Sequence, residues 1–152
     1  MVVAELGRLG IVATTFSGNV PDIDILAYKD GKSVAIQVKA NRQGNISVDG
    51  KRYLDIQFDG DTQTVIGKSK SIDRDLIFVW VSIGEEAGGD RYFVCDHGFL
   101  QDRICDNYTR FLKKHSGVRP RNPKTTHCAC SERDFEGKEN NWSLVIEALR
   151  TR

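Results

Sequence analysis

The chain has 152 residues, of which 39% are hydrophobic and 28% are charged, and this size and composition predict one globular domain over residues 1–152. Its 22 basic and 21 acidic side chains give a net charge of +1, so the overall charge neither favours nor excludes a nucleic-acid partner. No apolar stretch approaches the roughly 20 residues that cross a bilayer. Glu5 and Arg8 lie where a signal peptide would be apolar. The sequence therefore predicts a cytoplasmic α/β protein with no membrane partner.

Hydrophobic periodicity and turn residues divide the chain into short helices and strands. In chain order they predict a helix over 2–9, strands over 11–16, 22–28 and 33–39, a second hairpin over 45–58, a weak helical segment over 62–68, strands over 76–81 and 91–95, a helix over 98–115 and a C-terminal helix from 142. Asp30-Gly31 and Asp49-Gly50 are typical of the turns of the two hairpins, and residues 17–19 mark a further turn. The fully apolar run at 76–81 is typical of a strand in the middle of a covered sheet.

Three polar residues lie on the two strands of the first predicted hairpin. Antiparallel pairing across its turn brings Asp24 close to Gln37, and Gln37 and Lys39 share a face because they are two residues apart. If the register places Asp24 on that face too, the three side chains converge on a sheet otherwise built from Val and Ile. Carboxylate and amide oxygens are ligands for Mg²⁺. A bound Mg²⁺ ion promotes phosphodiester hydrolysis, and a lysine beside it can position water or stabilise developing charge.

The stretch Pro21-Asp22-Ile23-Asp24, followed by Gln37-Val38-Lys39, resembles the motif of the PD-(D/E)XK, or restriction-endonuclease-like, nuclease superfamily. The resemblance implies an α/β fold with an αβββαβ core, in which helices flank a mixed central sheet. It also implies a metal-dependent endonuclease that hydrolyses DNA with Mg²⁺ or Mn²⁺. On this basis Asp24, Gln37 and the Val38 carbonyl are expected to bind the metal and Lys39 to be catalytic. Asp22 is the alternative aspartate.

Further segments extend the resemblance, and two residues depart from the superfamily's pattern. The strand at 91–94, the basic segment after it and the closing residues 141–144 resemble a subgroup of small bacterial proteins. Gln37 stands where most members have Glu or Asp, which removes one negative charge from the metal site. Glu5 is the only candidate for the glutamate that members often place in the first helix, and it is an optional outer base. A non-catalytic DNA-binding or scaffolding module that keeps the fold is therefore the alternative.

A second group of candidate residues lies in a basic segment. The chain has no acidic residue from Asn107 to Ser131, and the basic side chains there are Arg110, Lys113, Lys114, Arg119, Arg121 and Lys124. Such a segment is either a DNA-binding surface that contacts backbone phosphates or an ordinary solvated face. Cutting both strands of DNA would need two active sites, which is consistent with a homodimer or a higher homo-oligomer.

The four cysteines suggest reduced thiols, since the predicted compartment is reducing. Cys128-Ala129-Cys130 beside His127 leaves open a structural zinc site. The one-residue spacer is shorter than the spacers usual in zinc knuckles. A small zinc-bearing interaction domain is thus the third hypothesis.

Overall fold

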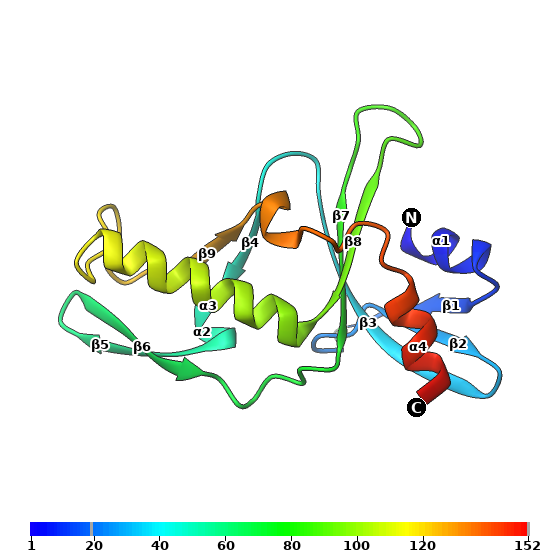
Figure 1. Ribbon diagram of the computed structural model, residues 1–152, viewed down its shortest axis with the longest axis horizontal. Helices are drawn as coiled ribbons and strands as arrows, with labels where there is room; N and C mark the ends of the chain where they lie inside the picture. Colours follow the sequence, from blue (N-terminus) through cyan, green and yellow to red (C-terminus); the bar gives the residue numbers. More distant parts are fainter. Residues whose placement is uncertain (19, 152) are drawn as a thin grey trace. The chain divides into compact units, whose positions relative to one another are not determined.

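The computed structural model describes residues 1–18 and 20–151, so Asn19 of the predicted turn at 17–19 lies outside the described residues. The chain folds into two compact units, each built from segments that are distant in the sequence (Figure 1). Unit 1 contains residues 1–44, 75–96 and 135–152, and unit 2 contains residues 45–74 and 97–134. A single domain over 1–152 therefore stays a prediction. Over the described ranges, no helix combines the length and the hydropathy needed to cross a membrane.

Unit 1 is built around a five-stranded mixed sheet with the strand order β1-β2-β3-β7-β8. Only β3 and β7 run parallel, and the other neighbours are antiparallel. Its elements are α1 (Val2–Arg8), β1 (Val12–Thr15), β2 (Ile25–Lys29), β3 (Lys32–Asn41), β7 (Ile77–Ser82), β8 (Arg91–Asp96) and α4 (Ser143–Thr151). The predicted α/β class, with helices beside a mixed sheet, is confirmed. The connection from β3 to β7 runs through short strands and the one-turn helix α2 (Gly50–Tyr53) rather than through a long helix.

The two faces of this sheet bury different kinds of side chain. On one face α1 and α4 pack against aliphatic strand residues, and the resulting core includes Val2, Leu6, Ile25, Ile36, Val79, Val94, Val145 and Leu149. On the other face lies an aromatic cluster in which the Trp80 ring is 4.9 Å from Phe93 and 5.1 Å from Phe135, measured between ring centroids. Both faces of β7, which lies between β3 and β8, are therefore covered, and this explains its uninterrupted apolar sequence.

The first hairpin has the predicted turn. Asp30 and Gly31 both have positive φ, at 51° and 81°, as the two central residues of a type I′ turn require. The pairing register sets Ile25 opposite Ile36. The strand β2 begins at Ile25 rather than at the predicted residue 22, because Asp22 adopts a left-handed φ of 69° and takes no part in the ladder.

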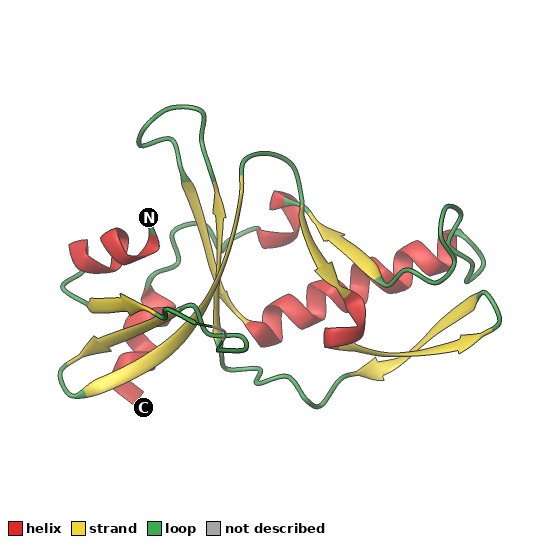
Figure 2. Ribbon diagram, turned by 180° about the vertical axis from the view of Figure 1, so that it is seen from behind, coloured by secondary structure: helices red, strands yellow, loops and turns green. Residues whose placement is uncertain are grey.

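Unit 2 contains two small sheets and the long helix α3 (His97–Lys114) (Figure 2). Its strands are β4 (Ile46–Asp49), β5 (Leu54–Asp59), β6 (Thr62–Lys68) and β9 (His127–Cys130). The short 3₁₀ helix after β9, Glu132–Phe135, ends on the first residue of the next unit 1 segment. The strand β4 pairs with β9, and β5 pairs with β6. The predicted helix α3 is confirmed.

Two predictions in unit 2 are wrong. The hairpin predicted over 45–58 does not form, because Asp49 Oδ1 accepts the Lys51 N–H at 3.1 Å and starts α2 instead of a turn. The helical segment predicted over 62–68 is the strand β6, consistent with its content of β-branched residues. The true hairpin joins β5 to β6 through Gly60, whose φ is 56°.

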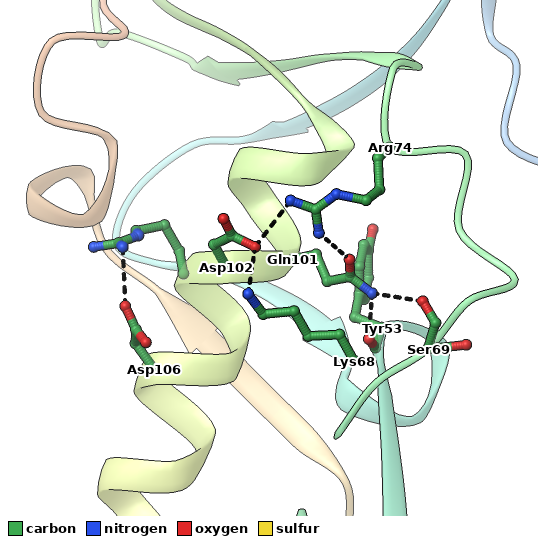
Figure 3. A network of polar contacts seen from close by, with 8 residues as sticks. Tyr53, Lys68, Ser69, Arg74, Gln101, Asp102 and Asp106 are labelled. Atoms are coloured by element: carbon green, nitrogen blue, oxygen red, sulfur yellow. Dashed lines mark hydrogen bonds and ion pairs between the residues drawn. The ribbon is translucent and has the colours of Figure 1, made fainter. Parts of the chain in front are cut away.

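A polar network around the buried Gln101 anchors α3 in unit 2 (Figure 3). Its Nε2 donates to the carbonyls of Tyr53 and Ser69, at 2.7 Å and 2.8 Å. Next to it, Asp102 forms ion pairs with Lys68 at 2.9 Å and Arg74 at 3.2 Å. Burial alone would raise the pKa of Asp102, but these two cations outweigh it and hold the pKa below its ordinary value. The network thus joins α3 to β6 and to the backbone of Tyr53 and Ser69 within unit 2.

Candidate functional site

The backbone of Asp24 is held between two strands of the unit 1 sheet. Its carbonyl accepts the Phe16 N–H at 3.1 Å, and its own N–H donates to the Ile36 carbonyl at 3.0 Å. Its carboxylate oxygen Oδ2 accepts the Val38 N–H at 2.7 Å. Asp24 therefore contacts β3 on either side of Gln37, and the structure brings these two predicted site residues together.

Alternation along β3 separates polar from apolar side chains. Val38 packs against the aliphatic core with Val34 and Ile36, so Gln37 and Lys39 face the opposite side of the sheet. Gln37 is half-buried and Lys39 is exposed. Asp24, Gln37 and Lys39 are thus near one another. They lie just before the first residue of β2, Ile25, in a part of the sheet that solvent can reach.

One more residue belongs to this polar row and was missed from the sequence. Asn41 lies two residues after Lys39 on the same face, and its Oδ1 accepts the indole N–H of the fully buried Trp80 at 2.6 Å. Trp80 is also the register partner of Lys39 across β3 and β7. The period-two pattern of Gln37, Lys39 and Asn41 could have indicated this position. We infer that Asn41 fixes the end of β3 that carries Lys39.

The oxygen atoms at this point suit a hard divalent cation. The N–H and C=O of one strand residue point to the same side, so the Val38 carbonyl lies on the edge of β3 that Asp24 contacts. Asp24 supplies a carboxylate, and Gln37 can supply an amide oxygen. In residues 1–18 and 20–151, no three His, Cys, Asp or Glu side chains gather to hold a metal. One carboxylate with an amide oxygen and a strand carbonyl is a partial ligand set, of the kind that suits a cation such as Mg²⁺ that keeps several waters.

The two other acidic candidates differ from Asp24 in their places in the fold. Asp22 precedes β2 in a left-handed conformation. Glu5 is on α1, which covers the opposite, aliphatic face, and it forms an ion pair with Arg8 at 2.8 Å. Burial raises the pKa of Tyr92, and the neighbouring Glu5 carboxylate raises it further. Among the described residues, no hydrogen bond or ion pair joins Glu5 to Asp24.

The six basic candidates all lie in unit 2, on α3 and on the loop that follows it. Five are exposed, namely Arg110, Lys113, Lys114, Arg121 and Lys124. Lys124 forms an ion pair with Asp61 at 3.4 Å. Arg119 differs, because it is only 9% exposed and its guanidinium lies over the rings of Phe111 and Tyr108. The first five are therefore accessible to a ligand, while Arg119 has a structural role as well.

The cysteine pair on β9 gives little support to the zinc hypothesis. Cys128 and Cys130 are buried, and they lie on the same face of the strand because they are two residues apart. A hydrogen bond from the Cys130 thiol lowers the pKa of Cys128 despite its burial, and the charge of Arg119 lowers it further. Within the described part of the chain they have no third ligand of the kind that zinc requires.

Comparison with known proteins adds one structural likeness. No protein-family model matches the chain, and no curated protein matches it. Among solved structures, the bacterial homing endonuclease I-Ssp6803I is similar, with a TM-score of 0.51 over 96% of this chain and 86% of that chain. The sequence identity is 14%, so the likeness shows the fold alone. The chain thus has a fold that is also found in a homing endonuclease.

Proposed function

We propose that the protein is a metal-dependent endonuclease of the PD-(D/E)XK superfamily that hydrolyses phosphodiester bonds in DNA. The observation that carries this proposal is that Asp24 forms hydrogen bonds with β3 on both sides of Gln37, to the Ile36 carbonyl and from the Val38 N–H. The fold shared with a homing endonuclease supports it. A carboxylate next to an amide, a strand carbonyl and a lysine is an arrangement that this reaction can use.

Each residue has a defined task in this proposal. Asp24, the Gln37 amide and the Val38 carbonyl would hold Mg²⁺ or Mn²⁺, and the Val38 N–H keeps the Asp24 carboxylate in place. The cation, when bound, neutralises charge on the phosphate and lowers the pKa of a water molecule. Lys39 would donate a hydrogen bond to the attacking water or to a phosphate oxygen, since its ammonium group has three donors and no acceptor.

The exposed cations of unit 2 would contact the DNA backbone. Arg110, Lys113 and Lys114 on α3, with Arg121 and Lys124 in the loop, would bind phosphates without reading bases. Such binding weakens steeply with salt, because each neutralised phosphate releases counterions. A homodimer or higher homo-oligomer would supply the two active sites that a double-strand cut needs.

A non-catalytic DNA-binding module is the second candidate, and Gln37 is the residue that favours it. An amide in place of a carboxylate leaves Asp24 as the only anionic ligand of the proposed set, which weakens cation binding. Glu5 forms an ion pair with Arg8, so its carboxylate is not part of the proposed ligand set.

Nicking of supercoiled plasmid with Mg²⁺ or Mn²⁺ tests the proposal. We expect the parent protein to nick the plasmid only with metal, and Asp24→Ala and Lys39→Ala to lose this activity. Lys32→Ala is the matched control for Lys39→Ala, because it removes the same charge from the far end of β3. Asp22→Ala removes the alternative aspartate, and we expect it to keep the activity. Activity that survives both site substitutions would disprove the assignment of the site. DNA binding without nicking in any form would favour the non-catalytic module.

A further inference from the structure

A cavity of about 590 Å³ lies in unit 2, where the last turns of α3, the loop after it and the start of β9 meet. Phe111 of α3 and His115, which directly follows α3, line it together with Arg119, Arg121 and His127. A smaller cavity of about 180 Å³ shares Phe111, Arg119 and His127 with it. The larger volume is in the range of small-molecule sites, roughly 300–1,000 Å³, so a group the size of one nucleotide can enter.

Flat side chains form one wall of this cavity. The Phe111 ring is 38% exposed, and its centroid is 4.5 Å from that of His115. The Arg119 guanidinium lies 4.7 Å from the Phe111 ring centroid and 5.1 Å from that of Tyr108. Aromatic rings and arginine guanidinium planes are the surfaces on which unpaired nucleobases stack.

The charged side chains that line the cavity are basic, and the nearest acidic residue across the sheet is Asp49, which is the register partner of His127 and accepts a hydrogen bond from Thr126. Arg119 is buried, and its Nη2 donates to the His127 carbonyl at 2.7 Å, which fixes the guanidinium. In the described part of unit 2 it forms no ion pair, and the sequence has no acidic residue from Asn107 to Ser131. A buried charge is normally paired. A guanidinium that forms no ion pair, in a cavity with no acidic lining residue, favours an anionic ligand, and Arg121 adds a second cation to the same lining.

We propose that this cavity binds one unpaired nucleotide of a DNA strand, with its base against Phe111 and His115 and its phosphate near Arg119 and Arg121. The inference rests on DNA as the ligand in the proposed function, and it does not depend on the metal site. It extends the contacts of unit 2 from backbone phosphates to a single base outside the duplex, and it predicts a preference for DNA with a gap, a bulge or a single-stranded end.

Fluorescence anisotropy in EDTA tests this preference, because cleavage cannot then interfere. The probes are a labelled duplex with one unpaired nucleotide and the same duplex fully paired. We expect the parent protein to bind the first about fivefold or more tightly than the second, as one stacked base allows. Phe111→Leu should abolish the difference, and Phe111→Trp should keep it. Arg110→Gln removes a charge on α3 outside the cavity and should weaken both complexes by the same factor.

The outcomes separate this inference from the proposed function. Equal affinity of the parent protein for both duplexes would overturn the inference and leave the nuclease proposal standing. Equal weakening of both complexes by Phe111→Leu, with an unchanged melting temperature, would also overturn it. If neither duplex is bound, both the inference and DNA as the ligand are contradicted. Phe111 is an exposed side chain, so the substituted proteins are expected to fold.

Discussion

Substitution of Asp24 separates the structural task of its carboxylate from its proposed chemical one. Oδ2 accepts the Val38 N–H at 2.7 Å, at a point of β3 that lies beyond the start of β2 at Ile25. Asp24→Ala removes this acceptor. Since a hydrogen bond contributes roughly 0.5–1.5 kcal/mol, the free energy of unfolding should fall by about 1 kcal/mol. For a chain of this size the melting temperature should fall by about 2–4 °C.

Asp24→Asn keeps an oxygen that can accept the Val38 N–H, but it carries no charge for a cation. We expect its melting temperature to stay close to that of the parent protein, while Mn²⁺ binding measured by titration calorimetry is lost. Asp22→Asn removes the charge of the alternative aspartate and should bind Mn²⁺ as the parent protein does. If the folded Asp24→Asn protein binds Mn²⁺ with parental affinity, Asp24 is not a metal ligand. If Asp24→Ala and Asp24→Asn are equally stable, the hydrogen bond to Val38 does not contribute as calculated.

Three further changes test other parts of the structure. Gln37→Glu adds a charge beside the cation and should tighten Mn²⁺ binding by about tenfold or more, whereas unchanged affinity would favour the non-catalytic module. Asp102 has a lowered pKa, so its ion pairs should stabilise the fold above about pH 4, its ordinary range, and lose this effect as pH falls through the lowered pKa. The stability advantage of the parent protein over Asp102→Asn in urea unfolding should therefore shrink below about pH 4, and a constant advantage would contradict this. Trp80→Phe loses the hydrogen bond to Asn41 and part of a buried ring, and should reduce unfolding free energy by about 2–3 kcal/mol; a change below about 0.5 kcal/mol would show that the bond has little effect.

The parts of the fold that depend on neighbouring residues could be predicted from the sequence. The hairpin of β2 and β3 follows from the Asp30-Gly31 turn, and α3 follows from its apolar spacing. Unit 2 was harder, because β4 finds its partner in β9, which is far along the chain. Asp49-Gly50 is also ambiguous alone, since Asp begins helices as readily as turns. Gly50 has no room for a side chain, with the Tyr108 ring 2.7 Å from the position of a Cβ, and only the tertiary structure shows this.

Of the candidate site, only the part that depends on residues close along the chain could be predicted. The proximity of Asp24 and Gln37 follows from counting residues across one turn. The hydrogen bond from Val38 to the Asp24 carboxylate could not be predicted, because the ladder shifts beyond Ile25 and Asp24 donates to the Ile36 carbonyl there. The burial of Arg119 was also missed. Its neighbours Tyr108 and Phe111 lie on another element, so the sequence around Arg119 shows only an exposed basic loop.

The most direct measurement is the single-turnover rate of Mg²⁺-dependent DNA cleavage by the parent protein, by Asp24→Asn and by Lys39→Met, at protein concentrations that saturate the DNA. We expect the parent protein to cleave and each variant to be slower by at least about 100-fold, while all three bind DNA equally in EDTA. Cleavage by both variants at the parental rate would contradict the proposal that Asp24 and Lys39 form the active site.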